Sequence, residues 1–374
     1  MIPVKAVAGS LVVLVILWDA FESIVLPRRV TRRFRLTRLF YLSTWKPWAA
    51  AARRLPSGKT RQALLSAFGP LSLLLLVAFW AVGLVFGFSL LHAAAGTAPG
   101  YPLNLYMSGS TFFTLGLGDV APNTAASRFV TVSEAGVGFG FLALTIGYLP
   151  VIYGAFSRRE TNISLLDARA GSPPTARELL ARYGRPEHVG SLAQFLRDWE
   201  VWTADLMESH LSYPVLCYYR SQHDNQSWLA ALTAILDTCA LLVAHAEGEI
   251  AWQARLTYAI ARHAVVDLSQ VLNVAPDRSA PDRLPRPALE EIRNELRSAG
   301  VPLCARDTAE ETLREVRRMY EPYVYALGTR LIMPIPAWSN PARAANWQTS
   351  AWEKTAAGRP ETEAAASGVD REHL

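Results

Sequence analysis

The sequence predicts an all-α fold in which membrane-spanning helices precede a second domain that is also helical. The length of 374 residues leaves room for both parts. Hydrophobic residues make up 51% of the chain and charged residues 18%, but the two kinds are unevenly distributed. Long apolar runs dominate up to about residue 157, and charges become frequent after it. Three of the early runs are long enough to cross a bilayer.

The predicted spans comprise residues 4–26, 68–92 and 129–156. A helix needs about 20 predominantly apolar residues to cross the hydrocarbon core of a bilayer, and each run meets this requirement. In the first span the basic residues follow the apolar run, and no cleavage pattern of small residues is present. We therefore interpret this span as an anchor that stays in the protein, not as a cleaved signal peptide.

The charges between the spans predict an orientation. Residues 28–61 are rich in arginine and lysine, whereas residues 93–127 contain neither. The positive-inside rule then places 28–61 in the cytoplasm, together with the domain that begins behind Arg158 and Arg159, and leaves the N-terminus outside. We therefore expect a multi-pass protein of the cell (plasma) membrane.

The basic segment also predicts partners. Residues 31–55 are basic, aromatic and amphipathic, which favours a stretch lying on the inner leaflet, with anionic lipids as candidate partners of 28–61. A short soluble linker is the alternative. The net charge of +5 is modest and the basic residues cluster at the membrane edges, so no nucleic-acid partner is expected.

The segment between the second and third spans has the features of a pathway for ions. Non-helical backbone at membrane depth is tolerated only where it is buried in protein or lines water. Gly116 and Gly118 can take the positive φ values that let successive carbonyl groups point the same way. With the Thr114 hydroxyl, these carbonyls can replace the water shell of a permeating cation. The carbonyls belong to Thr114, Leu115, Gly116 and Leu117. Residues 103–113 are expected to form a short supporting helix whose C-terminal dipole end faces the cation path.

Here the sequence resembles the potassium-channel pore family. Residues 111–119 read Thr-Phe-Phe-Thr-Leu-Gly-Leu-Gly-Asp, similar to the family pattern T-x-x-T-[VI]-G-[YFL]-G-D, and Pro122 and Thr124 continue its D-x-x-P-x-T extension. The resemblance covers residues 65–157. It implies a potassium-selective channel that conducts passively, with permeant K+ as its bound ion, no other cofactor and no enzymatic activity.

The resemblance also implies roles for individual residues. The ion-coordinating filter is expected to consist of Thr114, Leu115, Gly116, Leu117 and Gly118, with K+ bound at the first four. The residues expected to support the filter are Ser110, Thr111, Asp119 and Glu134. Since the chain has one filter segment and the family surrounds the ion with four, a homotetramer is implied.

One departure from the family pattern motivates an alternative function. Leu117 stands where the family usually has tyrosine, and residues 103–113 lack the tryptophans that often hydrogen-bond that tyrosine. A weakly selective cation channel is therefore one alternative. The other is a membrane-anchored signalling protein with a vestigial pore, although no nucleophile–base pair or phosphate-binding loop supports it.

The third span is expected to line the inner cavity and to contain the gate. Gly138 is either a gating hinge or a point of close helix packing, and the sequence favours neither. Pro150 removes one backbone hydrogen bond and is expected to kink the helix near its cytoplasmic end. The side chains spaced to share the cavity face are Phe139, Leu142, Ile146 and Pro150.

Acidic residues within spans are costly in a membrane and are expected to have partners. Glu134 is predicted to lie behind the filter, bonded to Ser110 or to filter amides, with outer-leaflet water as the alternative. Asp19 and Glu22 share one face of the first span and are predicted to pair with arginines such as Arg28.

The chain divides into five predicted segments. They are 1–27 (N-terminal membrane helix), 28–64 (basic cytoplasmic linker), 65–157 (pore domain), 158–335 (helical cytosolic domain) and 336–374 (disordered tail). Residues 229–246 are apolar enough to raise the question of a fourth span, but Asp237 and His245 favour a buried core helix. The last helix is predicted at 307–327. The tail is rich in Ala, Pro, Thr and Glu, which is typical of disorder.

Overall fold

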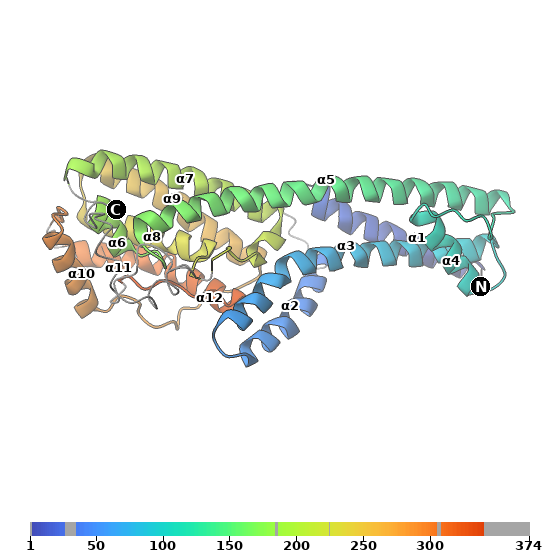
Figure 1. The fold of residues 1–374 in the computed structure, drawn as a ribbon, viewed down its shortest axis with the longest axis horizontal. Coiled ribbons are helices and arrows are strands. Elements are labelled where there is room, and N and C mark those ends of the chain that lie inside the picture. The colour runs from blue at the N-terminus through green and yellow to red at the C-terminus, as the bar shows by residue number, and fades with distance from the viewer. Residues whose placement is uncertain (1, 27–34, 184–185, 224, 305–307, 340–374) are drawn as a thin grey trace, which may run out of the picture.

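The computed structural model describes residues 2–26, 35–183, 186–223, 225–304 and 308–339. Within these ranges the regular structure is helical and contains no strand, so the predicted all-α class is confirmed. Figure 1 shows an elongated molecule with a bundle of shorter helices at one end and long, nearly parallel helices at the other. The end with the long helices carries the predicted filter segment.

Three long helices build the membrane part. They are α1 (Ile2–Ala20, extended by a π-helical turn at Phe21–Val25), α3 (Lys59–Ala95) and α5 (Ala125–Ala170). Each is long and apolar enough to cross a bilayer. Helices α1 and α3 cross closely because glycines face each other, and a Cβ added to Gly9 would lie 2.7 Å from the Gly87 carbonyl oxygen. Small residues at such crossings are typical of helices packed in a membrane.

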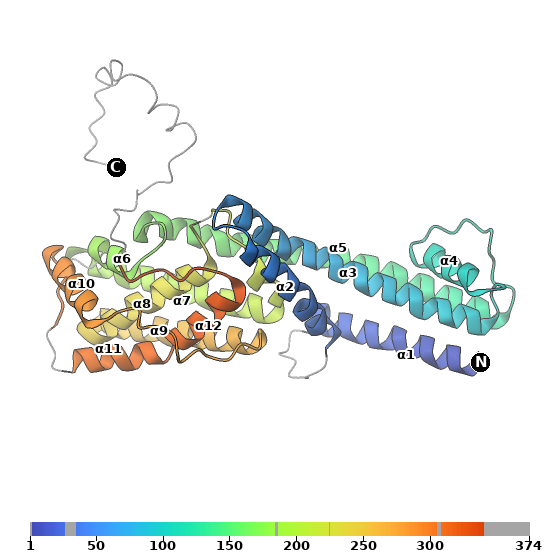
Figure 2. The same ribbon diagram turned by 90° about the horizontal axis from the view of Figure 1, so that it is seen from below.

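The predicted basic linker contains a well-packed helix, α2 (Leu36–Arg54). Trp45 is 2% exposed, and its indole N–H donates to the Arg330 carbonyl oxygen at 3.0 Å. The same ring packs edge-on against Phe68 of α3, with 4.7 Å between the ring centroids. Helix α2 therefore ties α3 to the helical bundle (Figure 2), and its place on the inner leaflet stays a prediction.

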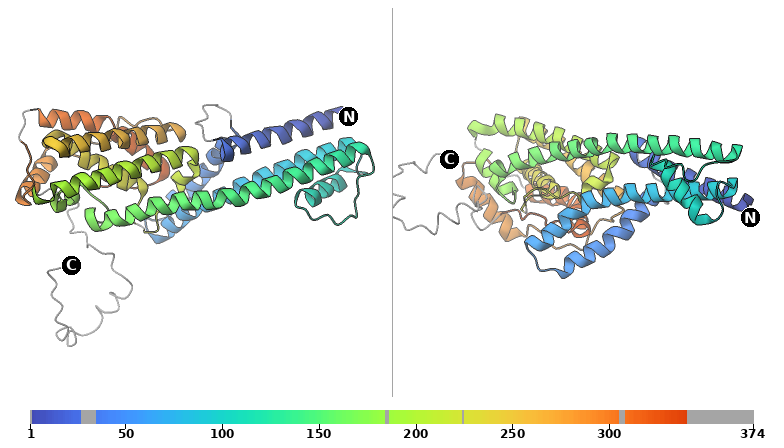
Figure 3. Two further views of the ribbon diagram at one scale, coloured as in Figure 1. Left: turned by 90° about the horizontal axis from the view of Figure 1, so that it is seen from above. Right: turned by 45° about the vertical axis from the view of Figure 1, so that its right-hand side comes forward.

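Helix α5 runs past the predicted end of the third span and enters the bundle (Figure 3). Its 46 residues correspond to about 69 Å at 1.5 Å per residue. Pro150 lies inside this helix without ending it. Arg159, expected at the membrane edge, is 1% exposed instead and donates to the carbonyl oxygens of Leu216 and Tyr219, each at 3.0 Å. It therefore fixes α5 to the bundle.

The bundle surrounds one apolar helix. Its members are α6 (Ala176–Tyr183), α7 (Val189–Ser212), α8 (Trp228–His245), α9 (Gly248–Val271), α10 (Arg286–Ser298), α11 (Ala309–Arg318) and α12 (Glu321–Leu331), with short 3-10 turns at Pro186–His188 and Pro214–Tyr218. Helix α8 is apolar enough to span a membrane, but 94% of it is buried inside the protein. It is therefore a core helix, as Asp237 and His245 had suggested.

The helix predicted at 307–327 is two helices in the structure. Helix α11 ends at Arg318 and α12 begins at Glu321. Pro322 occupies the first turn of α12, where its missing N–H needs no partner, and it cannot continue the hydrogen bonding of a helix that precedes it. The break places Tyr320, which is fully buried, at the junction.

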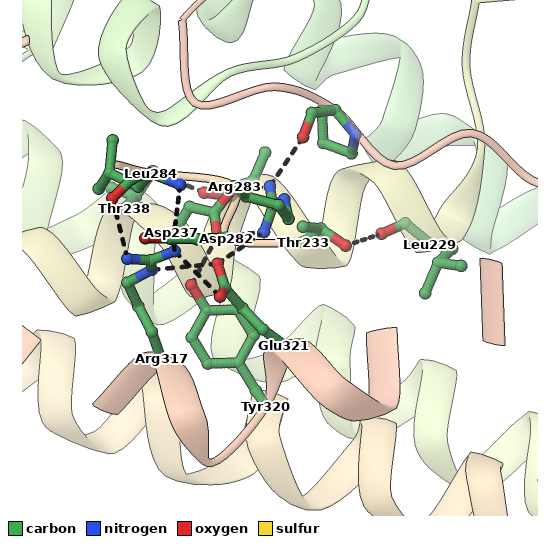
Figure 4. Close-up of polar contacts among 12 residues, drawn as sticks. Leu229, Thr233, Asp237, Thr238, Asp282, Arg283, Leu284, Arg317, Tyr320 and Glu321 are labelled. Atoms are coloured by element: carbon green, nitrogen blue, oxygen red, sulfur yellow. Dashed lines mark hydrogen bonds and ion pairs between the residues drawn. The ribbon is translucent and has the colours of Figure 1, made fainter. Parts of the chain in front are cut away.

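A buried network of charges fastens the proline-rich loop before α10 to the core helix (Figure 4). Asp237 of α8 is 0% exposed and accepts two hydrogen bonds from Arg283, at 3.1 and 2.7 Å. The Tyr320 hydroxyl donates to the same carboxylate at 2.6 Å. Glu321 lies 3.2 Å from the Arg283 guanidinium, and also pairs with Arg317 of α11. The network thus holds three elements against α8.

The beginning of the predicted disordered tail is ordered. Trp338 is 2% exposed, and its ring centroid lies 5.7 Å from the Arg283 guanidinium carbon and 5.4 Å from that of Arg317. The Pro336 carbonyl oxygen accepts from Arg283 at 2.7 Å. The prediction of disorder is therefore wrong for residues 336–339, and residues 340–374 lie outside the described part of the chain.

Candidate functional site

A short helix, α4 (Tyr101–Phe112), stands in front of the predicted filter, close to the expected 103–113. Gly100 precedes it with φ +87°, and Pro102 in its first turn presets a helical φ. The Asn104 side chain donates to the carbonyl oxygens of Ala98 and Gly100 at 2.9 and 2.7 Å. These contacts determine where the chain turns from α3 into α4.

The backbone after α4 alternates in handedness. Thr114, Gly116 and Gly118 have φ values of 58°, 58° and 79°, and Leu115 and Leu117 between them are not in the positive-φ region. The two glycines behave as predicted, whereas the positive φ of Thr114 was not foreseen because a β-branched residue rarely adopts it. Leu115 also departs from the family pattern, which has valine or isoleucine there. The segment nevertheless has the alternation that carbonyl alignment requires.

The amide groups of this segment are directed back to α4. Ser110 accepts three hydrogen bonds. Its carbonyl oxygen accepts from the Leu115 and Gly116 amides at 2.8 and 3.4 Å, and its hydroxyl oxygen accepts from the Gly116 amide at 3.2 Å. The Thr111 carbonyl oxygen accepts from the Thr114 amide at 3.1 Å. In the described structure no hydrogen-bond donor reaches the carbonyl oxygens of residues 114–117. Those oxygens therefore have no protein donor within the described structure.

Asp119, the third predicted support residue, is held by a side chain that sequence reasoning missed. The Tyr106 hydroxyl donates to its carboxylate at 3.0 Å, so the end of the filter segment is bound to the middle of α4. Both residues lie on the face predicted to be external. The signal in the sequence was a hydroxyl-bearing aromatic residue near the middle of the short helix that precedes the filter segment.

Glu134 lies between α3 and α4, with other partners than predicted. It is 0% exposed, its Oε2 lies 2.8 Å from His92 Nε2, and its Oε1 lies 2.5 Å from Ser108 Oγ. Both Ser110 and outer-leaflet water are therefore wrong as partners, because Glu134 meets the side of α4 that carries Ser108, and residues two apart on a helix do not share a side. His92 was missed, although His92 and Glu134 are the residues of the His, Asp, Glu, Lys and Arg types in the predicted spans 68–92 and 129–156.

Gly138 is a point of close approach. A Cβ at this position would lie 2.3 Å from the Phe112 carbonyl oxygen, at the C-terminal end of α4. By contrast, a Cβ at Gly136 or Gly140 would meet no atom within 4 Å. The packing role is therefore observed, whereas the hinge role remains a prediction.

We expect opposite effects of alanine at two neighbouring glycines of α5. Gly138→Ala must displace the backbone of α4 and should lower the free energy of unfolding by about 1–3 kcal/mol. Gly136→Ala is the matched control, because it gains helix propensity in open space and should stabilise slightly, by up to about 1 kcal/mol. Thermal unfolding of the detergent-solubilised protein would measure both. Equal shifts in Tm would contradict the close contact.

The predicted cavity side chains share a face that is open in the single chain. Phe139, Leu142 and Ile146 are 68%, 53% and 63% exposed, and Pro150 is also exposed. Only 17% of the apolar part of α5 is buried. The residues are thus on one accessible surface, and their role as gate or cavity lining stays a prediction.

The two acids of α1 have several described partners, and those of Glu22 include an arginine, as predicted. Asp19 accepts from the Trp80 indole N–H at 2.9 Å and from the Thr37 hydroxyl at 2.7 Å. Glu22 accepts from the Trp18 indole N–H at 2.8 Å and lies 3.8 Å from Arg35. Arg28 lies outside the described residues. The carboxylates therefore join α1 to α2 and α3.

Comparison with known proteins agrees with this geometry. Residues 73–152 match a family model described as an ion channel, which covers α4, the filter segment and most of the two helices around it. The resemblance to channel pores is therefore confirmed for this region, which matches an ion-channel family.

A curated relative covers more of the chain. An uncharacterized membrane protein of Bacillus subtilis (strain 168), YdjJ, is 23% identical over 263 residues, which are 68% of this chain and 75% of that protein. No solved structure matches.

Proposed function

We propose that the protein conducts potassium ions passively and selectively through a pore whose filter is residues 114–119. The observation that carries this proposal is the alternating handedness of the backbone at residues 114–118, whose carbonyl oxygens at 114–117 receive no hydrogen bond in the described structure while the Leu115 and Gly116 amides donate to Ser110. Carbonyl oxygens in such a row replace the hydration shell of K+. Permeant K+ is then the bound ion, and neither another cofactor nor an enzymatic step takes part.

The pore requires four copies of the chain, because one filter segment cannot surround an ion. The exposed apolar face of α5 supports this proposal, since Phe139 and Ile146 would then face a shared cavity. We also propose that the protein lies in the cell membrane with its N-terminus outside and the α6–α12 bundle in the cytoplasm. This orientation is supported by the positive charges of 28–61 and by the absence of Arg and Lys from 93–127. Anionic lipids are the proposed partners of 28–61.

We expect a homotetramer in detergent. The mass of the purified protein, measured by light scattering with the bound detergent subtracted, should equal four chains. The close contact between Gly9 of α1 and Gly87 of α3 forms within one chain, so it does not compete with contacts between chains. A monomeric or dimeric mass for protein that conducts K+ after reconstitution would contradict the four-fold arrangement.

Reversal potentials in opposing K+ and Na+ gradients test the function itself. Purified protein in liposomes should give a reversal potential close to that of K+. A potential midway between the two ions would favour the weakly selective cation channel, for which Leu117 in place of the usual tyrosine is the motive. Absence of current from tetrameric protein would favour the vestigial pore.

A further inference from the structure

Four buried polar side chains form a cluster between α3, α4 and α5, here termed the Glu134 cluster. Its members are His92, Thr97, Ser108 and Glu134. They come from the end of α3, the loop after it, α4 and α5, and none is more than 4% exposed. A polar group at such depth is stable only if its hydrogen bonds are made, so each contact in the cluster must contain one donated proton.

The Ser108 hydroxyl has one proton and two neighbouring acceptors. Its oxygen lies 2.8 Å from the Val85 carbonyl oxygen of α3 and 2.5 Å from Glu134 Oε1. A hydroxyl group donates once and can accept at the same time. If Ser108 donates to Val85, the second contact needs a proton from Glu134, which a neutral carboxyl group supplies.

The two hydrogen bonds of His92 can likewise each be given one proton. His92 Nε2 lies 2.8 Å from Glu134 Oε2, and His92 Nδ1 lies 2.9 Å from the Thr97 hydroxyl oxygen. A neutral imidazole that donates through Nε2 can accept from Thr97 through Nδ1. With a protonated Glu134, every contact then has one proton and no net charge is buried.

An ion pair fits the cluster less well. If Glu134 gave its proton to His92, Ser108 would have to divide one proton between two acceptors. Two full charges would also be completely removed from water, at a desolvation cost that often exceeds their attraction. Among the described residues, His92 is the titratable side chain hydrogen-bonded to Glu134, so no further cation offsets that cost.

We propose that Glu134 is a protonated positioning residue, whose neutral carboxyl group holds α4, and through α4 the filter, in place. Its partner Ser108 lies two residues before Ser110, which accepts the Leu115 and Gly116 amides. The link between Glu134 and conduction rests on the proposed function, whereas the protonation of Glu134 does not depend on it. Removing the proton at alkaline pH would leave an unpaired buried charge and loosen α4.

Glu134→Gln separates the neutral cluster from the ion pair. The glutamine amide can donate to Ser108 and accept from His92, just as the protonated acid does. We expect currents and K+ selectivity within about twofold of the parent protein, whereas Glu134→Ala, which leaves both partners unsatisfied, should lose about tenfold or more of the current. The parent current should fall as external pH becomes alkaline, and that of Glu134→Gln should not. If Glu134→Gln behaves like Glu134→Ala, the proposal is overturned.

Val132→Ala is the matched control, since this side chain lies on the exposed side of the same turn, at 73% exposure. Its pH profile should equal that of the parent protein. A flat alkaline response in the parent protein would also contradict the proposal.

Infrared spectroscopy of the purified protein tests the proton without any current. At neutral pH the parent protein should show a C=O stretching band of a buried, protonated carboxylic acid that Glu134→Gln lacks. If the protein did not conduct, this band would still establish the protonation while the proposed function failed. If the difference spectrum shows a carboxylate instead, the proposal fails even in a conducting channel.

Discussion

Replacing Gly116 or Gly118 by alanine is expected to abolish the potassium current. Both have positive φ, 58° and 79°, where a Cβ costs about 1–2 kcal/mol per residue. Neither Cβ would meet an atom within 4 Å in the single chain, so crowding is not the cause. The strain is relieved by rotating the peptide groups, which turns carbonyl oxygens out of the row. A homotetramer would carry the substitution in each of its four filter segments.

Single-channel recording of reconstituted protein would measure the effect. Gly190→Ala is the control, because it makes the same change in open space on a helical backbone, in α7 and away from the proposed pore, and should conduct normally. Selective currents of normal size in either filter variant would show that residues 114–119 are not the filter. Loss of the protein from the membrane would be detected separately by its yield after purification.

The sequence predicted the helices of the membrane part well, but not where they end. Hydropathy reports the apolar stretch that meets lipid, and this stretch ends near residue 156. Helix α5 continues to Ala170 because its later residues, such as Ile163 and Leu166, are buried against the bundle instead. Contacts between distant parts of the chain decide such an end, and no local pattern contains them.

The candidate site was predicted to a similar extent. Positive φ at the two glycines follows from the residue type alone. The partners of Glu134 could not be predicted, because they depend on how three helices are rotated about their axes. Trp338 is a comparable case, since the composition of its segment indicates disorder while one side chain packs beside two arginines. Single anchoring contacts of this kind do not change an average composition.

The bundle shows how a strongly apolar helix can hold a charge inside a protein core. Helix α8 carries Asp237 on a fully buried surface, and the neighbouring elements supply Arg283 and Tyr320 to it. Without these partners, the carboxylate would be costly to bury, whether in lipid or in an apolar protein core. The network therefore supplies the partners that a buried carboxylate on α8 requires.

Removing the Asp237 carboxylate is expected to destabilise the bundle strongly. Asp237→Ala leaves the Arg283 guanidinium, 6% exposed, without its bidentate partner, and the Tyr320 hydroxyl without an acceptor. Breaking one side of a buried pair costs about 3–5 kcal/mol. Arg283 keeps Glu321 at 3.2 Å and the Pro336 carbonyl oxygen, so we expect a loss near the lower end, about 3 kcal/mol.

A nearby surface pair provides the control. Arg286 and Glu290 of α10 lie 3.5 Å apart, but their side chains are 75% and 59% exposed, so Arg286→Ala should cost less than about 1 kcal/mol. Denaturant unfolding of the full chain in detergent, followed by tryptophan fluorescence, would compare the two variants. The double change of Asp237 and Arg283 to alanine should cost less than the sum of the single changes, because their interaction is counted twice in that sum. Equal losses for Asp237→Ala and Arg286→Ala would mean that the buried network contributes no more than an exposed ion pair.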